Sequence, residues 1–199
     1  MREKILSAAR ELFIREGVEA TTMRRIADAI EYTPPVIYCH FKDKEDLVRA
    51  LCEQDFALFR AALDGAYHLS DPVERLREMG RAYVRFALEH PHHYRLMFMT
   101  PRPAFSEEEL PEEHGNPDYD AYECLRRAVR ACIEAGRFAE RYRDPEAVTQ
   151  ACWGAAHGVV SLYIVLGADP WVNFRPAAHT AELLMDAQID GMLRGEGGR

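Results

Sequence analysis

Hydrophobic residues recur every three to four positions along almost the whole chain, which is the period of an amphipathic helix. Ile5, Ala9, Leu12 and Phe13 mark one face of the first such segment. No long stretch alternates between apolar and polar residues with the period of two that a half-buried strand requires. The pattern therefore predicts an all-α protein of about nine helices.

Capping residues indicate where the first helices begin and end. The first helix is predicted to stop at Gly17, and Thr22 is predicted to cap a short second helix. Thr33 precedes Pro34, a typical start signal, and the third helix is predicted to end around Lys42. Three short helices with a brief turn before the third predict a helix-turn-helix, whose third helix presents its start to the major groove of DNA.

The rest of the chain repeats the same signals. Further helix starts are predicted at Asp43, Asp71, Asp120, Asp144 and Pro176. Between Thr100 and Asp118, four prolines and five glutamates predict a mobile acidic loop.

The third helix carries the candidate DNA contacts. Ile37 and Phe41 lie four positions apart and are predicted to face the core, so their neighbours face outward. Hydroxyl, imidazole and ammonium groups suit phosphate oxygens, and an aliphatic side chain suits a thymine methyl group. The outward candidates are Thr33, Pro34, Val36, Cys39 and His40, with Tyr38 toward an edge, Lys42 and Lys44 following, and Arg24 of the second helix solvated or phosphate-facing.

The net charge of −8 argues at first against a nucleic-acid partner. The charge is unevenly distributed, however, because residues 1–49 contain nine basic and nine acidic residues, whereas residues 50–199 contain 16 basic and 24 acidic ones. The acidity thus belongs to the part of the chain that follows the predicted helix-turn-helix. Total charge does not exclude DNA binding.

Several other classes of protein are disfavoured. Five cysteines without CxxC spacing argue against a zinc ribbon or a disulfide framework. Pro91 interrupts the cluster His90, His92 and His93, so no metal site is predicted there, and neither a cofactor site nor a catalytic constellation is predicted. The charged N-terminus lacks a signal-peptide pattern, and a cytoplasmic location is expected.

The stretch from Ala147 to Ala168 contains no charged residue over 22 positions. This length suffices to span a bilayer, but the central helix of an all-α domain has the same composition. The polar residues and glycines within the stretch favour the second interpretation, so no membrane partner is predicted.

The run from Thr22 to Ala29 and the run from Tyr32 to Leu47 together resemble the DNA-binding domain of TetR-family transcriptional regulators. The family pattern is T-x-x-x-I-A, a turn, then S/T-x-x-x-I/L-Y-x-H/Y-F-x-x-K-x-x-L, and every keyed position is filled. Two departures lie in and after the turn, where Glu31 replaces a frequent glycine and Pro35 a small residue. The resemblance implies that Thr22, Thr33, Tyr38, His40 and Lys44 contact DNA.

The resemblance further implies a DNA-binding domain at residues 1–47 and an effector-binding and dimerisation domain at residues 48–199. It places the last two long helices in a homodimer interface, and small residues along them would allow close helix approach: Gly154, Ala155, Gly158, Ala177, Ala178 and Ala181. Candidate effector-lining residues are Tyr83, Phe86, Tyr94, Phe98, Tyr122, Trp153 and His157, although aromatic residues at helical spacing are more often plain core.

These features predict a ligand-responsive repressor that binds a double-stranded DNA operator and is released by a small-molecule effector. Two alternatives remain open at this point. A small all-α enzyme would use His157 with an acid, and a membrane-anchored helical protein would use the uncharged stretch.

Overall fold

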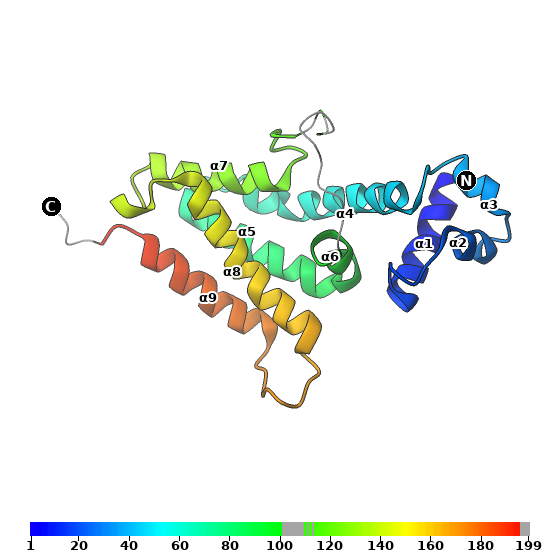
Figure 1. Ribbon diagram of the computed structural model, residues 1–199. Coiled ribbons are helices and arrows are strands. Elements are labelled where there is room, and N and C mark those ends of the chain that lie inside the picture. Colours follow the sequence, from blue (N-terminus) through cyan, green and yellow to red (C-terminus); the bar gives the residue numbers. More distant parts are fainter. Residues whose placement is uncertain (101–109, 111, 113, 196–199) are drawn as a thin grey trace. The chain divides into compact units, whose positions relative to one another are not determined.

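The computed structural model describes residues 1–100, 110, 112 and 114–195, and the acidic segment predicted between Thr100 and Asp118 lies largely outside them. Within the described residues the regular structure is helical and contains no strand, which confirms the all-α prediction (Figure 1). The chain forms two compact units. The first unit is Met1–Ala57 with His92–Leu110, and the second is Leu58–Pro91 with Pro111–Arg199.

The first unit contains the predicted helix-turn-helix. Its helices are α1 (Arg2–Glu16), α2 (Met23–Ala29), α3 (Pro34–Tyr38), the first part of α4 (Lys44–Tyr67) and most of α6 (Pro91–Phe98). In Figure 1, α1, α2 and α3 lie together at the N-terminal end of α4, and α2 packs on both α1 and α3.

The core of the first unit explains why these short helices fold. Ile5, Ile26, Ile37 and Leu47, one from each of the first four helices, are fully buried in a single apolar cluster. Burial of one such side chain contributes about 1.5–3 kcal/mol, whereas a helix as short as α3 is not stable alone. Tertiary packing therefore holds the helix-turn-helix together.

The second unit is a bundle. It contains the rest of α4, then α5 (Pro72–Glu89), α7 (Ala121–Glu134), α8 (Pro145–Leu166) and α9 (Ala177–Met192). The helix α8 packs on α5, α7 and α9, and α8 and α9 run side by side (Figure 1).

The predicted aspartate caps are confirmed at the starts of these helices. The carboxylate of Asp71 accepts the N–H groups of Val73 and Glu74 at 2.8 and 3.0 Å. Asp120 and Asp144 cap α7 and α8 in the same way. Each cap pairs backbone donors that the helix itself leaves unsatisfied.

The helix α8 is long and apolar enough to span a membrane by length and composition, and 28% of its most apolar window is buried. Its inner side, at Val148, Ala156 and Val160, contacts the bundle core. Its outer side exposes Leu162 and Val165, which are 51% and 58% exposed. The uncharged stretch is thus a bundle helix with one apolar face left uncovered within the single chain.

Candidate functional site

The start of α2 is built by its cap. The hydroxyl of Thr22 accepts the N–H of Arg25 at 3.1 Å, as predicted, and Ile26 and Ala27 are buried against α1 and α3. Arg24 lies exposed on the opposite side of α2 and makes no ion pair among the described residues.

Arg25, in contrast, is held by Glu16 of α1 at 2.9 Å. The hydrogen bond from Arg25, together with that from Arg15, lowers the pKa of Glu16 to about 2. Two of the basic residues near α2 are therefore paired within the protein, and Arg24 is left to meet an external anion.

The turn between α2 and α3 contains a non-glycine residue in the left-handed region. Glu31 has φ 61°, and the following N–H of Tyr32 donates to the carbonyl of Ala27 at 3.0 Å. Lys4 lies over the ring of Tyr32 at 4.9 Å and donates to the carbonyl of Ile30 at 3.2 Å. The turn thus keeps the geometry for which glycine is commonly used, at a steric cost of about 1–2 kcal/mol.

Replacing Glu31 with glycine is expected to stabilise the protein by about 0.5–1 kcal/mol, because glycine adopts positive φ without a Cβ clash but loses more freedom on folding. Urea denaturation followed by circular dichroism measures the change. Glu31→Ala removes the same carboxylate and keeps the Cβ, so it should leave stability nearly unchanged. Equal stabilities of the glycine and alanine variants would show that the turn is not strained.

The helix α3 is shorter than predicted. It ends at Tyr38 rather than around Lys42, and the chain continues in a turn in which the N–H of Phe41 donates to the carbonyl of Ile37 at 3.0 Å. This bond keeps Ile37 and Phe41 on one side, and both are buried as predicted. Pro35 fits because it lies within the first turn.

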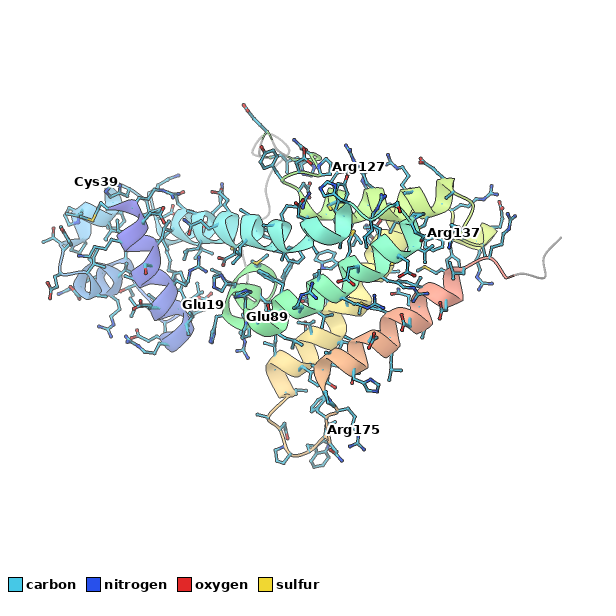
Figure 2. The ribbon with its side chains drawn as sticks, turned by 180° about the vertical axis from the view of Figure 1, so that it is seen from behind. Glu19, Cys39, Glu89, Arg127, Arg137 and Arg175 are labelled. Carbon is cyan, nitrogen blue, oxygen red and sulfur yellow. The ribbon has the colours of Figure 1, made fainter. Side chains whose placement is uncertain are left out.

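Thr33 begins α3 as predicted, but its hydroxyl accepts no N–H from the helix. Tyr38 is 54% exposed, and Cys39 beside it projects outward (Figure 2). Of the ten predicted DNA contacts, the exposed ones are Thr22, Arg24, Thr33, Tyr38, Cys39, His40 and Lys42, and the partly buried ones are Pro34, Val36 and Lys44.

Lys44 has partners inside the protein. Its ammonium group donates to the carbonyls of Val18 and Glu19 at 3.0 and 3.3 Å, which joins α4 to the loop before α2. An ammonium group has three donors, so one remains for a phosphate. The backbone N–H of Lys42 donates to Asp46 at 2.9 Å, which leaves the Lys42 side chain to face solvent.

Five of the seven predicted effector-lining residues lie in the second unit. The indole N–H of Trp153 donates to the hydroxyl of Tyr83 at 3.2 Å, and that hydroxyl lies 3.4 Å from Nδ1 of His157. Phe86 and Tyr122 join this group through ring contacts, Phe86 by way of Phe59 and Tyr122 directly with Trp153.

Burial lowers the pKa of His157, which favours the neutral imidazole. Its Nε2 lies 3.1 Å from the hydroxyl of Ser161. The neutral ring can therefore accept from Tyr83 at Nδ1 and donate to Ser161 at Nε2. Trp153 remains 37% exposed, so this aromatic group is open to solvent on one side.

Tyr94 and Phe98, the other two predicted lining residues, lie in the first unit. Their rings contact each other at 4.9 Å, and Phe98 meets Phe56 at 5.4 Å. Tyr94 is almost fully buried. Within this unit both residues act as core, which is the more common role of aromatic residues at helical spacing.

A shallow apolar depression of about 440 Å³ lies on the outer side of α8, where Gly158 leaves room between its neighbours. Ser161, Leu162, Val165 and Leu166 form the rest of its lining. The depression is open, so it has the shape of a surface on which another helix packs.

Sequence reasoning missed one group of charged side chains in the first unit. Asp55 of α4 is buried, with 1% of its side chain exposed, and it contacts Arg10 of α1 and His93 of α6. The local signal was the position of Asp55, four residues after the buried Leu51 on the apolar side of α4. Its partners are 45 and 38 residues away in sequence, so periodicity did not identify them.

Comparisons with known proteins agree with this architecture. Residues 5–51 match the family model described as bacterial regulatory proteins, tetR family. Residues 76–188 match the model described as tetracyclin repressor-like, C-terminal domain.

Among curated proteins, the chain is 34% identical over 79 residues to the HTH-type transcriptional regulator UidR of Escherichia coli K12, covering 38% of this chain and 40% of that protein. It is 34% identical over 95 residues to the HTH-type transcriptional repressor KstR2 of Mycobacterium tuberculosis H37Rv, covering 46% of each. The chain thus matches less than half the length of these curated relatives.

Solved structures match over nearly the whole chain. The TetR family transcriptional regulator PfmR from Thermus thermophilus is 26% identical with a TM-score of 0.69, over 98% of both chains. SmeT, the repressor of the Stenotrophomonas maltophilia multidrug efflux pump SmeDEF, is 22% identical with a TM-score of 0.67, over 98% of this chain and 92% of that one, which bears on the fold alone.

Proposed function

The chain belongs to the TetR family of bacterial regulatory proteins, and on this premise we propose that it is a ligand-responsive transcriptional repressor. The observation that carries the proposal is the outward face of α3, where Thr33, Tyr38 and His40 are exposed beside the buried Ile37. A family of transcription regulators leaves no support for the enzyme or the membrane-anchored alternative, and the expected location is the cytoplasm.

In the proposed complex, α3 enters the major groove of an operator. Tyr38, His40 and Lys42 donate to phosphates, together with Thr22, Arg24 and the remaining donor of Lys44. Pro34, Val36 and Cys39 offer apolar contacts to base edges such as a thymine methyl group, and Thr33 bonds a base or a phosphate. Since residues 1–49 carry no net charge, affinity rests on these few contacts and falls steeply with salt.

The Tyr38→Ala variant tests this assignment. We expect its affinity for the DNA upstream of its own gene to fall about 10- to 30-fold, because a dimer loses one contact in each half-site and each is worth about 1 kcal/mol. Fluorescence anisotropy at fixed salt measures the affinity.

Tyr119→Ala is the matched control, since Tyr119 is an exposed tyrosine of the second unit. It should bind like the unmodified protein. Unchanged affinity of Tyr38→Ala would refute the contact.

The proposed assembly is a homodimer through α8 and α9. On α8 the exposed residues Gly154, Gly158, Leu162 and Val165 form one apolar stripe, and a Cβ placed on either glycine would meet nothing within the chain. On α9, Leu183 is exposed. Small residues beside large ones favour close helix packing, and a two-fold dimer matches a near-palindromic operator. Ala181 is buried in the chain's own bundle and does not belong to this face.

The proposed effector site is the aromatic group of Tyr83, Phe86, Tyr122, Trp153 and His157. The uncharged α8 and the neutral His157 favour a small, largely apolar effector that carries a hydrogen-bonding group. The effector would shift the dimer toward a spacing that no longer matches both half-sites. A crystal structure with a ligand retained through purification tests which side chains touch it.

A further inference from the structure

Asp55 joins three helices of the first unit through one buried carboxylate. The Nη1 atom of Arg10, on α1, lies 2.7 Å from Oδ1 and 2.9 Å from Oδ2 of this carboxylate. Nδ1 of His93, on α6, lies 2.8 Å from Oδ1. The proposed DNA contacts and the effector site use none of these side chains.

The donors in this cluster have a defined direction. A carboxylate only accepts, so both Arg10 and Nδ1–H of His93 donate to Asp55. Arg10 also lies 3.0 Å from Nδ1 of His93, so all three groups are in mutual contact. A buried charge without its partners costs several kcal/mol, and therefore the three helices are held in the one arrangement that keeps the cluster together.

The cluster lies beside two of the points at which the chain passes from one unit to the other. The chain leaves the first unit within α4, between Ala57 and Leu58, and re-enters it between Pro91 and His92 at the start of α6. Asp55 lies two residues before the first of these points, and His93 is the second residue after the other. Arg10 links both of them to α1, on which α2 packs.

We propose that Asp55 is a positioning residue, which together with Arg10 and His93 fixes the direction in which the helix-turn-helix leaves α4 and α6. This rests on the proposed function as a dimeric operator-binding protein. In such a dimer the direction sets the half-site spacing that both α3 helices reach at once. Apolar contacts alone tolerate small slides of one helix on another, whereas hydrogen bonds to a single carboxylate do not.

The chain offers a matched control for this cluster. Gln54, next to Asp55, also joins α4 to α1, through a bond of 3.1 Å to Glu3. That bond lies at the exposed surface and does not involve α6. Gln54→Ala therefore removes an α1–α4 contact without disturbing the cluster.

The experiment compares four variants on three DNA duplexes. The variants are Asp55→Asn, which keeps the shape and removes the charge, His93→Leu, His93→Asn, whose amide can still donate to Asp55, and Gln54→Ala. One duplex carries the operator footprinted upstream of the protein's own gene, and the others have one or two base pairs inserted at its centre. Fluorescence anisotropy gives each affinity, and the ratio between spacings is the readout.

The unmodified protein should prefer the native spacing by at least about tenfold, and this ratio should fall to within about threefold for Asp55→Asn and His93→Leu. His93→Asn and Gln54→Ala should keep the original ratio. If Asp55→Asn does not fold, His93→Leu decides the outcome.

Loss of affinity by the same factor at every spacing would indicate a purely structural role and overturn the proposal. Failure of the unmodified protein to bind any of the duplexes would instead overturn the proposed function, and this assignment with it.

Discussion

Replacing Arg10 with methionine should lower the free energy of unfolding by about 3 kcal/mol, because it leaves the buried carboxylate of Asp55 with His93 as its remaining partner in the cluster. Methionine keeps most of the apolar length of the arginine side chain, so the loss reports the charge and its hydrogen bonds. Urea denaturation measures it, with the native fold checked by circular dichroism.

Arg24→Met serves as the control for Arg10→Met, since Arg24 lies exposed on α2. Its effect should stay within about 0.5 kcal/mol. Adding Asp55→Asn to Arg10→Met should recover part of the loss, because no unpaired charge is then buried. If Arg10→Met and Arg24→Met unfold at the same urea concentration, the cluster does not stabilise the first unit.

Replacing Val165 with glutamate should dissociate the proposed dimer. The two-fold axis places two carboxylates in one apolar interface, and each unpaired buried charge costs several kcal/mol. We expect the dimer dissociation constant to rise by at least about 100-fold, and operator affinity to fall by a similar factor because a monomer reaches one half-site. Light scattering after size-exclusion chromatography should give the 22.8 kDa mass of one chain in place of twice that mass.

Leu69→Glu is the matched control for Val165→Glu, because Leu69 is an exposed apolar residue away from α8 and α9. It should remain dimeric and bind DNA normally. A dimeric Val165→Glu protein, or an unmodified protein that is monomeric at micromolar concentration, would show that the outer face of α8 is not the interface.

The helix-turn-helix was largely predictable because its signals are local. Thr22 caps α2, Ile37 and Phe41 are buried, and Pro34 and Pro35 occupy the first turn of α3, all as the spacing indicated. Caps and periodicity depend on residues within one helical turn, which a single sequence displays. The end of α3 was less accurate, because a turn that preserves the i to i+4 bond of Phe41 has the same pattern as a helix.

The effector-site prediction was only partly local. Trp153 and His157 lie four positions apart on α8, so their shared face could be foreseen. Their bonds to Tyr83, 70 and 74 residues away, could not, and neither could the placement of Tyr94 and Phe98 in the other unit. The sequence pattern indicates that an aromatic residue is inside, but which aromatics share a cluster depends on how the helices pack.

The sequence by itself determined that this protein is all-helical, that it begins with a helix-turn-helix, and that its excess negative charge lies after residue 49. Only the tertiary structure decided that Lys44 anchors α4 to a preceding loop, that the outer side of α8 is uncovered, and that Asp55 lies between Arg10 and His93. The physical reason is range. Caps and periodicity act within a few residues, whereas a buried charge is tolerated only where distant parts of the chain bring its partners to it.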